Sequence, residues 1–336
     1  MRRLLLATVL FCAGALSTGC GSGTETGSAP VANLSGGGSA PHFLSLVPSA
    51  PFERAYYARR RVWQKHDEAT GPQTLEYTEK VWSDGQGQFS VVPEQVLAPA
   101  MSAQAQQVFL LMQKVREGFL YRLRDFRIHD LGSFLAGYTV EVLNGPVAVA
   151  GQHCERLRIR RATPSPTYWE IDVLASNGLI LGSREFLQDG TKVGEVETLE
   201  YQENPDLTGI TMHADLVTVP LVPATMVQQL GFAPLQPSFL PAGFALESAA
   251  RVSLGAESWA RFIYTDGAAE LFLLHKREPA PAPDAAATDP AGTSAIKVFR
   301  VGRWTVAQSN ANGNRLIVMG TQPVPVLIQV LQSTVH

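Results

Sequence analysis

Residues 138–202 read YTVEVLNGPVAVAGQHCERLRIRRATPSPTYWEIDVLASNGLILGSREFLQDGTKVGEVETLEYQ. Short runs rich in β-branched and aromatic residues alternate here with three turn pairs, Asn144-Gly145, Asn177-Gly178 and Asp189-Gly190. Both central residues of a type I′ turn need positive φ, which Asn, Asp and Gly adopt more readily than other residues. The stretch therefore predicts a meander of antiparallel strands.

Two of these strands sort their side chains onto an apolar face and a charged face, because successive side chains of a strand point to opposite sides. The apolar face holds Leu157, Ile159, Trp169, Ile171 and Val173. The charged face holds three arginines of one strand, Arg156, Arg158 and Arg160, and two acids of the next, Glu170 and Asp172. We predict that the apolar face is buried. We also predict cross-strand ion pairs on the other face, such as Arg158 with Asp172 or Arg160 with Glu170.

Length and charge set the broad class of the protein. A chain of 336 residues exceeds one ordinary hydrophobic core and suggests two domains. A formal net charge of −3 gives no global attraction to nucleic acid or to an anionic membrane. We expect no nucleic-acid partner.

Residues 1–20 have the pattern of a secretory signal. Arg2 and Arg3 precede an apolar run, Leu4–Leu16, that is too short to span a bilayer as a helix. Gly19-Cys20 at its end resembles the lipobox of bacterial lipoproteins, although Ser17 stands where Leu is usual. We expect Cys20 to be lipidated and to anchor the protein to a membrane. The alternative is an ordinary cleaved signal, with Cys20 left as a thiol in the tail.

Residues 21–50 are rich in Gly, Ser, Ala and Pro, a composition that buries too little apolar surface to offset chain entropy. We predict a disordered tether there. Once Cys12 leaves with the signal and Cys20 carries lipid, Cys154 has no partner for a disulfide. We interpret Cys154 as a half-buried structural thiol.

Strands begin near Arg54, and the domain predicted from them spans residues 51–203. Its first strand carries a basic cluster, Arg59, Arg60 and Arg61. Together with Arg158, this cluster is a candidate patch for an anionic ligand. The alternative, which is the commoner explanation of arginines along a strand, is that they form a solvated face of the sheet.

Between Ser102 and Leu123 the apolar residues recur every three or four positions, which predicts an amphipathic helix. An open antiparallel sheet with this helix on its concave face would bury the apolar stripe and leave a hydrophobic cleft. The fold class is thus α+β, mainly antiparallel β. The residues expected to line the cleft are Phe109, Met112, Phe119, Trp169 and Ile171.

The remaining chain predicts a second, smaller unit. Residues 204–236 are rich in Pro and serve as the expected interdomain connection, with a short helical stretch at 224–230. Residues 237–336 form a second β-rich domain with a Pro/Ala-rich loop at 278–294. For the final segment, PVLIQVLQSTV, the spacing of apolar residues fits a terminal helix, and a last strand fits nearly as well.

Motifs that carry catalysis or bind metal are missing from the sequence. It contains no Walker loop, dinucleotide glycine fingerprint, HExxH, paired CxxC or GxSxG. The seven histidines are scattered, with no two at a metal-ligand spacing on one element. We expect no catalytic residue, no metal site and no cofactor, and we interpret the protein as a binding protein.

Several of these segments together resemble the MucB/RseB family of sigma-factor regulators. The residues that carry the resemblance are YTVEVLNGPVAVAGQHCERLRIRR, the strand Tyr168–Leu174, Asn177-Gly178-Leu179 and the Asp189-Gly190 hairpin, followed by FLPAGF, Asp266-Gly267, VGRWTV and RLIVMG. The resemblance covers most of residues 52–336. It implies an unclosed LolA-like half-barrel wrapped around helices, plus a small C-terminal domain. It also implies a cleft for acyl chains or amphipathic peptides, and a partner, the periplasmic part of an anti-sigma factor.

Two functions follow as expectations. The first is a non-enzymatic, lipid-anchored envelope protein that binds an amphiphile or an anti-sigma factor and so regulates an envelope-stress sigma factor. The alternative is a LolB-like acceptor of lipid or lipoprotein, against which the extra C-terminal domain argues. Gly21 follows the cysteine in place of an Asp retention signal, so we expect the outer membrane rather than the inner one.

Overall fold

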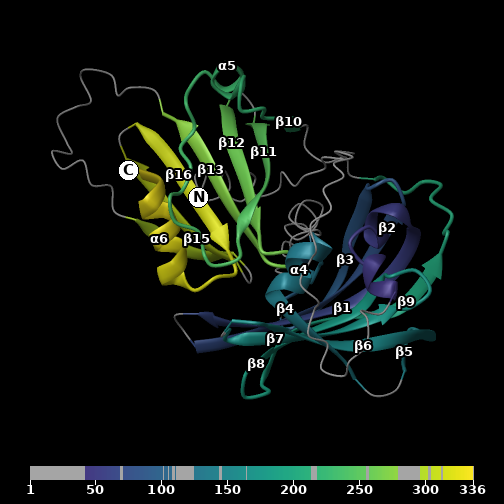
Figure 1. The fold of residues 1–336 in the computed structure, drawn as a ribbon. Coiled ribbons are helices and arrows are strands. Elements are labelled where there is room, and N and C mark those ends of the chain that lie inside the picture. The colour runs from purple at the N-terminus through teal and green to yellow at the C-terminus, as the bar shows by residue number, and fades with distance from the viewer. Residues whose placement is uncertain are drawn as a thin grey trace. The chain divides into compact units, whose positions relative to one another are not determined.

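The chain divides into two compact units between Asp215 and Leu216, called here the N-terminal unit and the C-terminal unit (Figure 1). A computed structural model describes residues 42–335 apart from 69–70, 101, 105, 108–109, 111–124, 144–145, 164, 213–217, 255–256, 279–295, 302–303 and 312. Among the described residues, none of the helices combines the length and the hydrophobicity needed to cross a bilayer.

The N-terminal unit is built on one antiparallel sheet, with neighbours in the order β3-β2-β1-β9-β8-β7-β6-β4 and with β5 also paired to β6. The described part of this path ends at β3 on one side and at β4 on the other. The sheet is therefore an open one, and it curves in Figure 1. Its elements are η1 (His42–Ser45), α2 (Ala50–Glu53), β1 (Ala55–Glu68), β2 (Gly71–Asp84), β3 (Phe89–Ala98), α4 (Leu131–Gly137), β4 (Tyr138–Val142), β5 (Val147–Val149), β6 (Gln152–Arg161), β7 (Thr167–Leu174), β8 (Ile180–Leu187) and β9 (Lys192–Glu203).

The predicted meander is confirmed from β6 to β9. Gly178 and Gly190 take the expected positive φ of 80° and 86° in the two turns that the structure describes; the Asn144-Gly145 pair lies outside the described residues. The predicted apolar face is buried, with relative exposures of 0% at Leu157, Ile159, Ile171 and Val173 and 8% at Trp169. The period of two in the sequence was sufficient to assign this face.

The C-terminal unit is a second antiparallel sheet, ordered β10-β11-β12-β13-β16-β15-β14. Its strand β10 lies within the predicted connection of residues 204–236 but pairs with β11, so part of that stretch belongs to the unit. The final segment is a helix, α6. The elements are β10 (Thr218–Pro220), α5 (Met226–Leu230), β11 (Ala245–Leu254), β12 (Glu257–Thr265), β13 (Glu270–Arg277), β14 (Lys297–Val301), β15 (Trp304–Ala311), β16 (Asn314–Gly320) and α6 (Val324–Val335).

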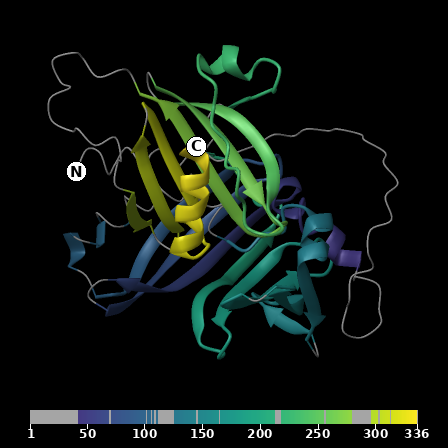
Figure 2. The same cartoon turned by 60° about the vertical axis from the view of Figure 1, so that its left-hand side comes forward.

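Helix α6 contacts strands β15 and β16 and packs on one face of this second sheet (Figure 2). Three of its side chains, Leu327, Val330 and Leu331, have no exposed surface. They join a core with residues of the strands such as Phe262 and Leu273. Full burial of a Leu or Val side chain contributes about 1.5 to 3 kcal/mol, so α6 is a main source of stability for this unit.

Candidate functional site

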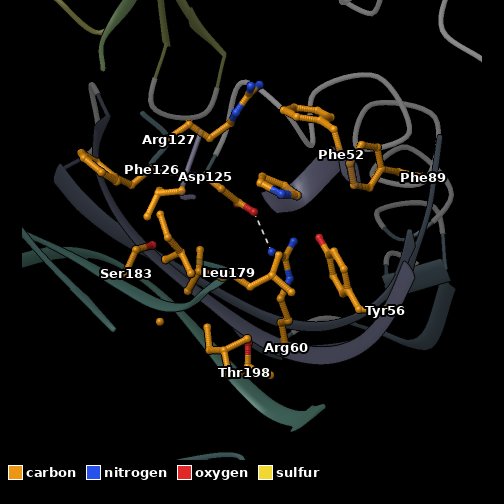
Figure 3. A pocket seen from close by; sticks show the side chains of 16 residues that line it. Phe52, Tyr56, Arg60, Phe89, Asp125, Phe126, Arg127, Leu179, Ser183 and Thr198 are labelled. Atoms are coloured by element: carbon orange, nitrogen blue, oxygen red, sulfur yellow. Dashed lines mark hydrogen bonds and ion pairs between the residues drawn. The ribbon is translucent and has the colours of Figure 1, made fainter. Parts of the chain in front are cut away.

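A pocket lies against the inner face of the N-terminal sheet (Figure 3). Its empty volume, including the open mouth, is about 620 Å³. The sheet contributes lining side chains from strands β1, β3, β8 and β9, among them Tyr56, Phe89, Ser183, Val196 and Thr198. Along β1 and β9 the lining residues alternate with residues outside the lining, so one face of the sheet forms the floor of the pocket there.

The second wall comes from the segment just before β1. Val47, Pro51 and Phe52 line the pocket, while Leu44 and Ala50 are buried, with exposures of 1% and 2%. Residues 42–50 were predicted to belong to the disordered tether, and this prediction was wrong. The stretch HFLSLVPSAPF carries enough apolar side chains to fold onto the sheet, and the averaged composition of residues 21–50 concealed it.

Gly178 allows this segment to approach the sheet closely. A Cβ atom at residue 178 would lie 2.6 Å from Cβ of Leu46, closer than two carbon atoms can approach. The same residue has a φ of +80°, which side chains rarely adopt. The turn that was predicted from Asn177-Gly178 therefore also makes room for the N-terminal wall.

The third wall is the segment 125–130, which precedes α4. Its Asp125 Oδ2 accepts a hydrogen bond from Nη1 of Arg60 at 2.6 Å. The ring of Phe126 packs on that of Trp169 with centroids 5.5 Å apart, and the guanidinium of Arg127 lies 4.5 Å from the ring centroid of Phe52. These contacts tie the segment to the sheet on one side and to the N-terminal wall on the other (Figure 3).

Arg60 places a charged group among these walls. It is 6% exposed, and its Nε donates to Oε1 of Glu79 at 3.0 Å; Glu79 on the neighbouring strand β2 has no exposed surface. A buried charge is tolerated only when it is paired, and removing one partner of such a pair typically costs about 3 to 5 kcal/mol. The β1–β9 register also shifts between Arg59 and Arg60, which is the kind of irregularity that redirects a side chain.

The four arginines predicted as an anionic-ligand patch do not lie together. Arg60 points to the pocket, whereas Arg59 pairs with Glu94 at 2.8 Å and Arg61 with Glu197 at 2.7 Å on the other face of the sheet. The hydrogen bonds of the Arg59 guanidinium to Glu94 and Glu200 raise its pKa above the usual value. Alternation along β1 separates Arg60 from its neighbours, as it does in any strand.

Arg158, the fourth member of that predicted patch, pairs with Glu170 at 2.8 Å, and Arg156 pairs with Asp172 at 2.7 Å. The predicted pairs, Arg158 with Asp172 and Arg160 with Glu170, were wrong by two residues. The register places Arg156 opposite Asp172 and Arg158 opposite Glu170, because Leu157 faces Ile171 and Ile159 faces Trp169 across the strands.

Asp172 is not a solvated acid, since it is only 1% exposed. A second arginine, Arg184, donates to its Oδ2 at 2.8 Å. A Cβ at Gly182, opposite on β8, would lie 2.7 Å from the same oxygen. Ion pairs therefore shield part of this face of the sheet from solvent, and Asp172 has a structural role in it.

Cys154 has no exposed surface, which is deeper burial than the half-buried thiol that was predicted. Burial raises the pKa of its thiol to about 12, and the nearby charge of Asp172 acts in the same direction. The thiolate is the reactive form of cysteine, so this residue is suited to packing and not to nucleophilic chemistry.

Of the residues predicted to line a cleft, Trp169 and Ile171 lie on the buried face of β7, and Trp169 reaches the pocket wall through Phe126. Phe109, Met112 and Phe119 lie outside the described residues. The prediction did not include Phe52, Asp125 or Arg127, which line the pocket. A signal for Phe52 existed in the apolar stretch before β1, whereas no local pattern links residue 125 to residue 60.

The chemistry of the lining is that of a binding site. Most lining side chains that the structure describes are apolar, and the others supply two guanidinium groups, one carboxylate, two aliphatic hydroxyls and the phenolic hydroxyl of Tyr56. The described lining holds no imidazole or thiol that could act as a base or nucleophile beside those hydroxyls. An apolar cavity with a few convergent polar groups is typical of a small-molecule site.

No family model matches the sequence, and no curated protein matches it. Among solved structures, the chain is similar to MucB from Pseudomonas aeruginosa in complex with MucA, at 15% identity and a TM-score of 0.48 over 86% of this chain and 95% of that one. A crystal structure of MucB gives 16% identity and a TM-score of 0.47 over 87% of this chain and 95% of that one. A LolA superfamily protein, NE2245 from Nitrosomonas europaea, gives 8% identity and a TM-score of 0.20 over 84% and 93%.

Proposed function

We propose that this protein is a non-enzymatic envelope lipoprotein whose N-terminal unit binds an amphiphilic molecule. The observation that carries the proposal is the apolar pocket on the inner face of an open sheet, walled by the segments 47–52 and 125–127. Its lining is mostly apolar with a few convergent polar groups, which is the usual composition of small-molecule sites.

The second part of the proposal concerns a protein partner. The motifs that resemble the MucB/RseB family extend over both units, and that family holds the periplasmic part of an anti-sigma factor. We infer that binding at the pocket is coupled to binding of such a partner and so regulates an envelope-stress sigma factor. A LolB-like acceptor would need the half-barrel alone, whereas this chain adds a complete second sheet.

The third part concerns location. Lipidation of Cys20 would hold the protein at a membrane with its two units facing the periplasm, and Gly21 favours the outer membrane. The mass of the mature N-terminal peptide tests this directly. An unmodified Cys20 would remove the anchor from the proposal and leave the pocket untouched.

The main experiment is affinity purification of the full chain from solubilised envelopes, with mass spectrometry of the lipids and proteins that accompany it. A pocket-filling variant, Ser183→Phe, is compared with Ser133→Phe, which places the same ring at an exposed position on α4. We expect the wild type and Ser133→Phe to carry an amphiphile and an anti-sigma factor, and Ser183→Phe to lose the amphiphile.

Each of the other possible results contradicts one part of the proposal. Lipid without any protein partner contradicts the regulatory role and favours the LolB-like alternative. Equal lipid recovery in both variants, once circular dichroism has shown that both are folded, contradicts binding in this pocket.

A further inference from the structure

Two hydroxyl groups on the floor of the pocket have no hydrogen-bond partner among the described residues. They belong to Ser183 on β8 and Thr198 on β9, which are only 9% and 4% exposed (Figure 3). A buried hydroxyl without a partner is unfavourable, and folded proteins keep few of them. Because both side chains line a cavity, the two hydroxyls are candidates for contact with a ligand.

The pairing of the strands brings these two hydroxyls close together. Ser183 lies opposite Val196 in the β8–β9 pair, and Thr198 follows two positions later on β9. Residues two positions apart share a face of a strand, so Ser183 and Thr198 are diagonal neighbours, with Cα atoms roughly 7 to 8 Å apart. One polar group of a ligand, such as a hydroxyl or an ester, could reach both of them.

The charged groups of the pocket, in contrast, are already engaged within the protein. Arg60 donates to Glu79 and to Asp125, and the guanidinium of Arg127 lies over the ring of Phe52. The two arginines and the two carboxylates balance each other in charge. A charged ligand would add a buried charge without a partner, which is costly in an apolar site. The groups that remain for a ligand are therefore the neutral hydroxyls.

We propose that the pocket binds an uncharged amphiphile whose hydroxyl or ester group forms hydrogen bonds with Ser183 and Thr198, while its alkyl chain lies against the apolar walls. A serine or threonine hydroxyl both donates and accepts, so it matches either kind of ligand oxygen. Fatty alcohols and monoacylglycerols have this chemistry. The inference rests on the proposed binding of an amphiphile and specifies its polar group.

Removing the two hydroxyls while keeping the floor filled tests the proposal. Binding of decanol and of decyl chloride to the full chain is measured by displacement of a fluorescent apolar dye. The two probes share their alkyl chain, but the chloride is a much weaker hydrogen-bonding group. The double variant Ser183→Ala, Thr198→Val should bind decanol about tenfold more weakly, because two neutral hydrogen bonds are lost. Its affinity for decyl chloride should stay within about twofold of the wild type.

Two charged probes with the same chain, decanoate and decylamine, test the preference for an uncharged ligand. At neutral pH the wild type should bind both more weakly than decanol, since neither charge finds a free partner in the pocket. Tighter binding of decanoate or of decylamine than of decanol would overturn the inference.

The matched control is Thr78→Val on the neighbouring strand β2. The Thr78 hydroxyl is also buried without a partner among the described residues, but Thr78 lies opposite Arg61 and is not part of the pocket lining. This variant should bind every probe like the wild type. In urea, the unfolding midpoints of Thr78→Val and of the double variant should not fall, because each change removes only unpartnered hydroxyls.

Three further results would overturn the inference. They are wild-type affinity for decanol in the double variant, an equal loss of affinity for decanol and decyl chloride, and a lower urea midpoint in the double variant alone, which would give the hydroxyls a structural role. The amphiphile pocket survives each of these results. Failure of the wild type to bind any of the four probes would instead remove the proposed function itself.

Discussion

The apolar faces of the two sheets of this protein are covered to different extents. In the C-terminal unit, α6 packs on one face, and its Leu327, Val330 and Leu331 side chains have no exposed surface. In the N-terminal unit, the inner face keeps a cavity whose walls carry the ion pair of Arg60 with Asp125. Burial of apolar side chains on a filled face stabilises the fold. A cavity and a buried charged group lower the stability of the fold, and binding sites commonly carry this cost. The comparison is the reason for placing the proposed ligand site in the N-terminal unit.

The buried polar groups show the same difference. His275 in the C-terminal unit has no exposed surface, and both of its ring nitrogens are bonded within the unit, one to the backbone N–H of Leu235 and one to Asn314. Arg60 in the N-terminal unit is bonded partly to a pocket-lining group, Asp125. The histidine lies outside the pocket lining, whereas the arginine and its partner Asp125 belong to it.

The largest expected effect on stability is that of Ile171→Asp, which should unfold the N-terminal unit alone. Ile171 has no exposed surface, and an unpaired carboxylate there would cost several kcal/mol, comparable to the whole stability of about 5 to 15 kcal/mol of a domain. Hydrogen exchange should show loss of protection from β1 to β9. Protection of β11 to β16 should persist, and its loss would contradict the independence of the two units.

Acid should weaken the C-terminal unit through His275. Its burial lowers its pKa below the usual 6.5, with a smaller effect of Arg277 in the same direction and an opposing one from the hydrogen bond with Asn314. The unfolded chain therefore binds the proton more readily, so stability is retained above about pH 6.5 and falls as the pH drops below it. The loss is at most about 1.4 kcal/mol per pH unit.

This loss is measured as the urea midpoint of the C-terminal transition between pH 7.5 and pH 5. The matched variant is His275→Gln, which lacks the titrating ring. Its midpoint should depend less on pH than that of the wild type. The same slope in both proteins would assign the pH dependence to other groups.

The smallest effect is expected for Arg158→Ala on the outer face of the N-terminal sheet. The Arg158 side chain is 29% exposed, and the hydrogen bond to Glu170 raises the pKa of its guanidinium. Ion pairs near the surface contribute only about 0 to 1 kcal/mol, so the melting temperature should move little. A shift as large as that of Ile171→Asp would refute the assignment of inner and outer faces.

Local patterns in the sequence were sufficient for the strands and their faces. The pairs Asn177-Gly178 and Asp189-Gly190 marked the turns, and alternation marked the buried side of β6 and β7. These features depend only on neighbours in the sequence and on the period of two. They required no knowledge of what packs against the sheet.

The register and the pocket could not be predicted in the same way. A shift of two residues keeps every side chain on its face, so alternation alone cannot distinguish Arg156 from Arg158 as the partner of Asp172. The contact of Arg60 with Asp125 joins positions 65 residues apart through a loop. Such closure is decided by tertiary packing, which no local pattern records.

The wall formed by Val47, Pro51 and Phe52 has a practical consequence for anyone who shortens the protein. A truncation at Arg54 would keep every strand and would look conservative on a sequence map, yet it would open the cavity to solvent on that side. Ligand screens should therefore use chains that start before His42.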